Sequence, residues 1–288
     1  MLDLPAPREG SLADYSHSRL STFEDCPRKF RFRYVDQIKV DTEGVEAFMG
    51  KRVHEILERL YHHVARHGRP PSLSQVLERF RQDWARAWHD KVTIVRAENA
   101  PDFYRDRGER CLSGFYRKHY PFSEGETIAI EQRLEWQLDP AGRHRAVGIV
   151  DRIVRRRDGV FEIHDYKTSG YLPPQQRVDE DRQLGLYQLG LEQTYADARE
   201  VELVWHYLVF DRTLRSRRSP EALEKLRDDT LRLIDRIEGE SAWEPRPSQL
   251  CKWCDYQQLC PAMKDEDRPL DGLPPQASFT SAQQLVLF

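Results

Sequence analysis

The sequence of 288 residues has no run of about 18 apolar residues, which excludes a helix that could span a membrane. It also lacks a surplus of positive charge, because 45 lysines and arginines stand against 48 aspartates and glutamates, a net charge of −3. Any binding of nucleic acid must therefore come from a local basic patch and not from the charge of the whole protein. No internal repeat is visible.

The Gly-x-x-x-x-Gly-Lys-[Ser/Thr] motif of nucleotide-binding loops is also absent, so we expect no ATPase of the usual kind. The first residues contain no basic segment followed by an apolar stretch, so we expect no secretory signal and a cytoplasmic protein. There are only five cysteines. In such a protein, cysteines are more often free thiols or metal ligands than disulfides.

The composition that remains, 39% hydrophobic and 32% charged residues, is typical of a soluble globular protein. The length allows one large domain or two small ones. We expect a single domain over residues 15–264. Prolines and a glycine indicate a flexible leader at residues 1–14, and residues 265–288 have the composition of a flexible tail.

The first half of the chain has the pattern of helices. Apolar residues at i, i+3, i+4 and i+7 predict an amphipathic helix over residues 47–66, with His54 at the edge of its apolar stripe. Further helices are expected over residues 73–97 and 102–119. A short helix capped by Ser16 or Ser18 is expected to end near Cys26.

From residue 127 onward, the apolar pattern changes to a period of two, which predicts strands. The expected strands cover residues 127–138, 146–154, 160–168 and 201–210. In the first, one face is expected to carry Ile128, Ile130, Leu134, Trp136 and Leu138. Helices are expected over residues 175–195 and 220–239. This order predicts an α/β domain in which helices flank a small mixed sheet.

Charged residues fall on two neighbouring expected strands. Asp165 and Lys167 point to the same side of one strand, and Asp151 lies on the strand before it, across a tight turn. Buried carboxylates are costly unless they are paired or bound to metal. Asp151, Asp165 and the backbone carbonyl of Tyr166 would suit Mg²⁺ or Mn²⁺, with His54 as a further ligand. The plainer alternative is a salt bridge at a strand edge.

A metal ion at such a site would polarise a phosphate and activate a water molecule. Lys167 would then stabilise the attacking hydroxide and the developing charge. Glu131 is a weaker candidate for a further acidic group near the metal, because it lies on the opposite face from Ile130.

Four motifs together resemble the PD-(D/E)XK nucleases of the RecB-type exonuclease branch. They are Gly50-x-x-x-His54, Gly148-Ile149-Val150-Asp151, Asp165-Tyr166-Lys167 and Gln183-x-x-x-Tyr187, and the resemblance covers about residues 15 to 262. It implies a restriction-endonuclease-like core. It implies catalytic roles for Asp151, Asp165 and Lys167, with His54 as a metal ligand.

The resemblance also implies that Gln183 and Tyr187 form a supporting pair that contacts DNA. Their spacing of four residues puts both on one helix face. The plainer alternatives are that Gln183 is an ordinary surface residue and that His54 is a buried core histidine.

The cysteines follow a three-plus-one pattern: Cys251, Cys254 and Cys260 are local, and Cys26 lies far upstream. Zinc sites more often use two local pairs, whereas this pattern with Cys-Pro endings suits an iron–sulfur cluster, and zinc remains the second choice. This cysteine pattern resembles that of a branch of the same nucleases, which includes AddB-type subunits and CRISPR-associated exonucleases. The resemblance implies a [4Fe–4S] cluster, an iron–sulfur clasp that joins the N- and C-terminal segments. We expect Cys111 to be a buried small hydrophobe.

Basic and aromatic residues alternate after Cys26. Either this segment is a helix with a solvated basic face, or its basic residues contact phosphates. Arg28 and Lys29 are the candidates for DNA binding.

The last five residues resemble the motif by which bacterial replication proteins bind the sliding clamp. The residues that carry the resemblance are Gln284, Leu285, Leu287 and Phe288. The alternative is that this segment packs back onto its own domain. A tether of this kind would raise the local concentration of the enzyme at its site of action.

Taken together, the resemblance implies a Mg²⁺- or Mn²⁺-dependent DNA exonuclease that acts on single-stranded ends in repair or recombination, with a separate helicase as a candidate partner. Two alternatives stay open. One is a CRISPR spacer-processing exonuclease, and the other is a catalytically inactive DNA-binding scaffold subunit.

Overall fold

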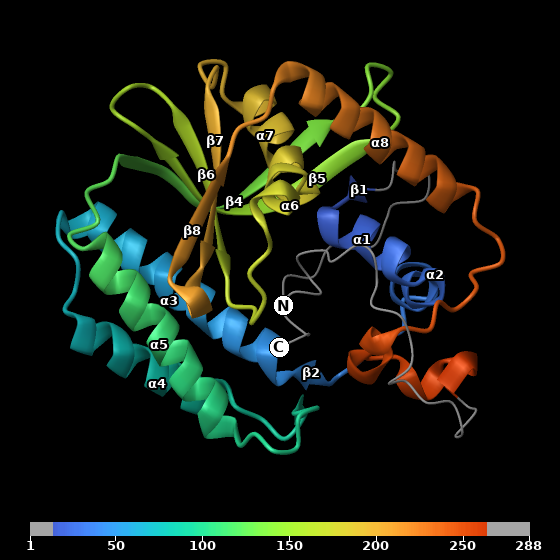
Figure 1. The fold of residues 1–288 in the computed structure, drawn as a ribbon, viewed down its shortest axis with the longest axis horizontal. Coiled ribbons are helices and arrows are strands. Elements are labelled where there is room, and N and C mark those ends of the chain that lie inside the picture. Colours follow the sequence, from blue (N-terminus) through green and yellow to red (C-terminus); the bar gives the residue numbers. More distant parts are fainter. Residues whose placement is uncertain (1–13, 264–288) are drawn as a thin grey trace.

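The computed structural model describes residues 14–263. These residues form a mixed sheet of six strands with helices on both faces, which confirms the expected α/β fold (Figure 1). Residues 1–13 of the expected leader and the whole expected tail lie outside the described residues. No helix within residues 14–263 is long and apolar enough to cross a membrane.

Strand β5 organises the sheet. The strands are β1 (Asp14–Tyr15), β4 (Glu126–Gln137), β5 (Arg145–Arg155), β6 (Phe161–Lys167), β7 (Val201–Tyr207) and β8 (Arg212–Ser216). Antiparallel β4 pairs with β5 along its length, whereas β6 pairs only with residues 152–155 and β1 only with residues 145–146. The middle of β5, which contains Asp151, is therefore left between these two ladders.

Strands β6 and β7 are parallel, and β8 returns antiparallel to β7. Parallel neighbours need a crossover connection, which α6 (Gln175–Asp179) and α7 (Arg182–Thr194) provide. The expected strand over residues 160–168 is confirmed as β6, and Asp158-Gly159 forms the turn before it, with Gly159 at φ 86°.

Helices α3 (Val45–His67), α4 (Leu73–Ala87) and α5 (Pro101–His119) cover one face of the sheet and share a core with Tyr166 and Leu208. On the other face, α1 (His17–Asp25), α7 and α8 (Pro220–Glu238) enclose a second core. Figure 1 shows the two helical layers on either side of the strands. The remaining elements are α2 (Pro27–Phe30), β2 (Glu43–Gly44), β3 (Val92–Thr93), a π-helical turn at Arg31–Val35 and short 3-10 turns at Leu208–Phe210, Gln249–Trp253, Gln257–Leu259 and Pro261–Met263.

Local sequence explains where the main helices begin and end. Of the two expected caps, Ser16 is the one used, because its side chain accepts the Arg19 N–H at 3.1 Å. Ser72 and Gln75 form a reciprocal capping box at the start of α4. Helix α3 ends at Gly68, whose φ of 68° is readily adopted only by glycine.

Three expected elements were wrong in their limits. The helix predicted over residues 73–97 ends at Ala87, because Trp88 leaves the helix to stack on Trp84 and the chain then pairs β3 with β2. The helix predicted over residues 175–195 is divided, because the Asp181 side chain accepts the Leu184 N–H and starts α7 anew. The strand predicted over residues 201–210 ends at Tyr207, and the unpredicted β8 follows.

The predicted face of β4 was also wrong in part. Ile128, Leu134 and Trp136 pack in the core below α7 and α8, whereas Ile130 packs against the core of α3–α5. The strand is irregular between Thr127 and Ala129, and Glu131 has a positive φ of 49°. Such irregularities shift the alternation of side chains, so a strict period of two could not describe this strand.

Candidate active site

The site forms where β5 and β6 separate. Their ladder ends at the pair Arg152–His164, and beyond it the Asp151 side chain takes the place of a backbone partner. Its Oδ2 accepts the backbone N–H of Tyr166 at 2.8 Å. The side chain that the sequence placed beside β6 is therefore held there by a hydrogen bond to the main chain.

Helix α3 contributes His54 from the opposite layer. His54 Nε2 lies 2.7 Å from the Tyr166 carbonyl oxygen, and its Nδ1 lies 3.5 Å from Asp151 Oδ1. The peptide groups on both sides of Tyr166 thus contact two of the predicted metal ligands. The structure thus brings together three of the four predicted metal-binding groups: His54, Asp151 and the Tyr166 carbonyl. Asp165, the fourth, does not form a group with His54 and Asp151 in which all ligand atoms lie within 4.8 Å of one another.

Asp165 and Lys167 lie next to each other on β6, with Asp165 Oδ2 2.7 Å from Lys167 Nζ. Lys167 also donates a hydrogen bond of 2.8 Å to Gln183 Oε1, and Gln183 Nε2 donates to the Tyr187 hydroxyl at 3.2 Å. The expected pair on α7 therefore positions the lysine. Tyr187 is buried, and its predicted contact with DNA stays a prediction.

A glycine in β5 allows α7 to come this close. A Cβ built on Gly148 would lie 2.2 Å from a ring carbon of Tyr187, which is far inside van der Waals contact. Gly148 belongs to the same motif as Asp151. Its absent side chain makes room for the helix that orients Lys167.

Glu131 joins the site. Its pairing position on β4 lies between Ile130–Arg152 and Gln132–Val150, directly opposite Asp151. Carboxylate oxygens of Glu131 and Asp151 and a ring nitrogen of His54 all lie within 4.8 Å of one another. Glu131 was only a weak candidate in the sequence analysis, because it was expected on the face of β4 opposite Ile130. Its position opposite Asp151 in an antiparallel pair is the pattern that could have identified it.

The electrostatics of the site favour a bound cation. Burial raises the pKa of Asp165 to about 6 although Lys167 opposes it, and burial with the Asp151 charge raises the pKa of Glu131 to about 7. Burial would lower the pKa of His54, but the Asp151, Asp165 and Glu131 charges raise it to about 9. The site thus contains three carboxylates but only two basic side chains, Lys167 and His54. A divalent cation would relieve the repulsion between the carboxylates.

The four cysteines predicted to bind an iron–sulfur cluster lie in a pocket of their own, away from Asp151 and His54. Cys26, Cys251, Cys254 and Cys260 line one pocket together with Arg28 and Lys29. Backbone N–H groups of Arg246 and Ser248 point at two of the sulfurs, Cys26 Sγ and Cys251 Sγ, each at 3.4 Å. No three of the sulfurs lie within 4.8 Å of one another. The structure therefore shows a shared pocket and not a compact ligand group.

The N- and C-terminal segments also contact each other without the cysteines. Phe30 stacks on Trp243 with ring centroids 5.7 Å apart, and Arg246 donates a hydrogen bond to the Glu24 carbonyl. The Tyr256 hydroxyl donates to the Ile38 carbonyl at 3.1 Å. The two segments that the expected clasp would join are adjacent in space.

Two remaining predictions concern single residues and the end of the chain. Cys111 is buried in the core of α3–α5, as expected, and burial raises the pKa of its thiol to about 11. The proposed clamp-binding residues Gln284, Leu285, Leu287 and Phe288 lie outside the described residues.

Comparison with known proteins gives one family. The family model of the PD-(D/E)XK nuclease superfamily matches residues 14–261. The chain is similar in structure to a protein from Eubacterium rectale described as a candidate exonuclease, with a TM-score of 0.50 and 14% identity over 96% of this chain and 94% of that one. At this identity the likeness shows a shared fold alone.

A second solved structure, that of the protein SSO0001, has 15% identity over 85% of this chain and 95% of that one. Its TM-score is 0.33, so it carries no argument. No curated protein matches the chain in sequence.

Proposed function

The chain belongs to the PD-(D/E)XK nuclease superfamily, and from this membership we propose that it is a Mg²⁺- or Mn²⁺-dependent exonuclease that hydrolyses DNA from single-stranded ends. The observation that supports this most is the convergence of His54, Asp151, Asp165 and Lys167 around the Tyr166 peptide. These groups come from α3, β5 and β6, so no local structural need brings them together.

Each group has a role that follows from its contacts. Asp151, Asp165, His54 and the Tyr166 carbonyl would hold the cation, which supplies polarisation of the phosphate and an activated water. Lys167 keeps its ammonium between Asp165 and Gln183, where it can stabilise negative charge on the attacking oxygen. Glu131 lies beside Asp151 and His54, where its carboxylate could accept a proton from the water.

The cysteine pocket is the proposed site of a [4Fe–4S] cluster, with zinc as the second choice. Three local cysteines and one distant cysteine are the pattern that suits such a cluster, and all four line this pocket. Thiolates bound to a cluster also accept backbone N–H hydrogen bonds, like those that Arg246 and Ser248 direct at Cys26 and Cys251.

The same pocket carries the proposed DNA contacts. Arg28 and Lys29 line it beside Cys26, so a cluster there would fix the basic segment in place. A role in repair or recombination, a separate helicase and a sliding clamp bound by Gln284–Phe288 remain predictions from the sequence resemblance.

The test of the catalytic role is digestion of end-labelled single-stranded DNA with Mg²⁺ or Mn²⁺. Wild-type protein, purified without oxygen, should degrade the DNA, and Lys167→Ala should lose cleavage while it still binds the strand. The matched control is Lys225→Ala, since Lys225 is an exposed lysine on α8 that pairs with its helix neighbour Asp229. A folded wild type that binds DNA but never cuts it would support a scaffold subunit instead.

The cluster is tested by colour and iron content. Cys254→Ser should lose the brown colour and lower the melting temperature, whereas Cys111→Ser should keep the colour because Cys111 lies in a different core. A Cys254→Ser protein that stayed brown would remove Cys254 from the ligand set.

A further inference from the structure

A second group of metal-ligating side chains lies on elements that the proposed active site does not use. His144 stands just before β5, and Asp235 and Glu238 belong to the last turns of α8. One ligand atom from each of the three residues lies within 4.8 Å of the other two. The sequence did not mark them, because 91 residues separate the histidine from the nearer acid.

The histidine is held in the manner of a metal ligand. His144 is only 7% exposed, and Asp139 Oδ2 lies 3.2 Å from its Nδ1. Although this contact is not an aligned hydrogen bond, a carboxylate at this distance favours the tautomer with the proton on Nδ1. The lone pair is then on Nε2, which faces Glu238 Oε1 at 3.5 Å. A carboxylate behind the histidine is the usual support of a metal-binding imidazole.

Asp139 is itself fixed for this role. Its two carboxylate oxygens accept the backbone N–H groups of Arg143 and His144, at 3.2 and 2.7 Å, in the turn between β4 and β5. These two hydrogen bonds hold the carboxylate in place behind the imidazole.

Asp235 and Glu238 form no ion pair with a lysine or arginine of the described residues. Within residues 14–263, no lysine or arginine nitrogen lies within 4.0 Å of either carboxylate. Both stand in the last turns of the helix, where the helix dipole disfavours negative charge. The Tyr15 hydroxyl donates to Glu238 Oε1 at 2.9 Å and fixes the position of this carboxylate.

We propose that His144 Nε2, Asp235 and Glu238 bind a divalent transition-metal cation, for which Zn²⁺ fits best. One imidazole and two carboxylates are a ligand set that Zn²⁺ accepts, with water in a fourth position. The cation joins the end of α8 to the β4–β5 turn, and through Tyr15 to the N-terminal strand β1. Its role is to stabilise this junction, and it takes no part in hydrolysis.

The test locates zinc in the full-length protein. Crystals soaked in ZnCl₂ should show anomalous scattering beside His144, a position that separates this ion from any ion at the cysteines or at Asp151. Zinc should also raise the melting temperature of the wild type. Asp235→Asn, a change at an exposed side chain, should weaken zinc binding at this position at least tenfold.

Asp229→Asn is the matched control, because Asp229 is also an exposed acid of α8 but pairs with Lys225 and Arg232. It should bind zinc as the wild type does. Absence of the anomalous peak at His144 would overturn the proposal, as would equal binding by Asp235→Asn. Loss of nuclease activity bears on neither outcome, because the two sites share no residue.

Discussion

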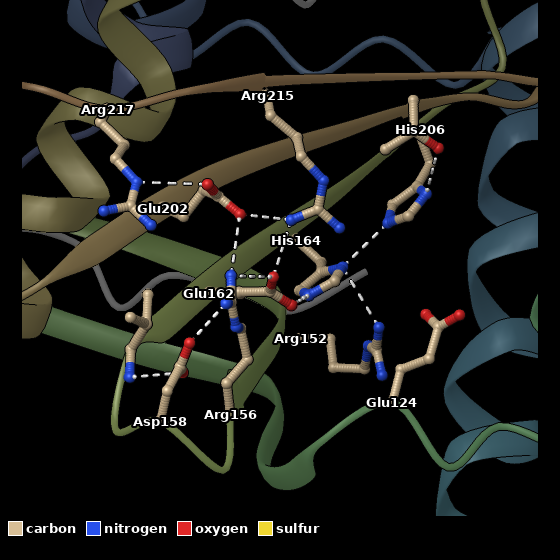
Figure 2. A network of polar contacts seen from close by, with 12 residues as sticks. Glu124, Arg152, Arg156, Asp158, Glu162, His164, Glu202, His206, Arg215 and Arg217 are labelled. Atoms are coloured by element: carbon tan, nitrogen blue, oxygen red, sulfur yellow. Dashed lines mark hydrogen bonds and ion pairs between the residues drawn. The ribbon is translucent and has the colours of Figure 1, made fainter.

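The two faces of β6 are both lined with buried polar groups, yet they differ in charge balance. One face carries Asp165 and Lys167 of the proposed active site. The other carries Glu162 and His164, which belong to the network drawn in Figure 2. On that face Glu162 contacts Arg215 at 2.7 Å and His164 at 3.0 Å, so its charge is neutralised within the protein.

Two histidines, His164 and His206, connect the charged residues of this network. His164 Nε2 donates to Glu162, and its Nδ1 accepts from Arg152 at 3.1 Å and from His206 at 2.8 Å (Figure 2). Burial also lowers the pKa of both histidines well below its usual value, which favours the neutral rings. On the face of Asp165, by contrast, the pKa values of Asp165 and Glu131 are raised because negative charge is in excess. A buried network in which positive and negative charges balance is typical of a structural role. An excess of buried negative charge is typical of a site that binds a cation.

The largest effect is expected from a substitution on the face of β6 that carries the proposed active site, and it should be a loss of nuclease activity. Asp165→Asn should lower the rate of DNA hydrolysis at least about 100-fold, because it removes a metal ligand and the partner of Lys167. Its free energy of unfolding without metal should not fall, since one of the mutually repelling carboxylates is gone. Nuclease rates and urea titrations of the same preparation measure both quantities. Equal loss of stability and activity would contradict the comparison.

Glu162→Gln is the matched change on the other face and should act on stability. It removes the carboxylate that accepts from His164 and that Arg215 contacts together with Glu202, which should cost about 1–3 kcal/mol of unfolding free energy. The rate per folded molecule should stay within about twofold of the wild type. A large loss of rate in fully folded protein would show that the network also serves the chemistry.

Gly148→Ala should have an effect of similar size on the catalytic face. The added Cβ meets the Tyr187 ring, so Tyr187 or β5 must shift, at a cost of about 1–3 kcal/mol. The rate should fall as well, because Tyr187 holds Gln183 and Gln183 holds Lys167. Gly114→Ala on α5, where an added Cβ meets nothing within 4 Å, is the control. Unchanged melting of Gly148→Ala would refute the proposed close contact.

The histidines of the network should make stability fall in acid. Burial lowers the pKa of His164 and of His206 well below the usual 6.5, and nearby Arg152, Arg215 and His119 lower them further. Below about pH 6.5 the unfolded chain therefore binds more protons than the folded one. The contribution of these two histidines to stability is complete above this pH and declines as pH falls, by at most about 1.4 kcal/mol per histidine and pH unit.

Urea titrations between pH 7.5 and 5.5 measure this decline. His206→Gln should have a shallower dependence of unfolding free energy on pH than the wild type, whereas His62→Gln, at an exposed position of α3, should not. Identical profiles for wild type and His206→Gln would exclude His206 as a source of the acid sensitivity.

The smallest effect is expected at the outer rim of the network. Arg217 pairs with Glu202 at 3.2 Å, but its side chain is 51% exposed. Arg217→Ala should therefore change the unfolding free energy by less than about 1 kcal/mol. A larger loss would show that the balance of charge extends to the surface.

Much of this protein follows from local sequence. Period-two and helical patterns predicted β5, β6, α3, α5 and α8 within a few residues, because each element has one buried face. The motif residues on α3, β5, β6 and α7 were predicted to meet, and His54, Asp151, Asp165, Lys167 and Gln183 do so.

Other features were decided only by tertiary structure. Glu131 enters the site because β4 is irregular and pairs its position with Asp151, and such irregularities leave no mark in a strict alternation. The meeting of His144 with Asp235 and Glu238 depends on elements far apart in the chain. Local patterns report which side of an element is buried, whereas register and packing decide which charged groups become neighbours.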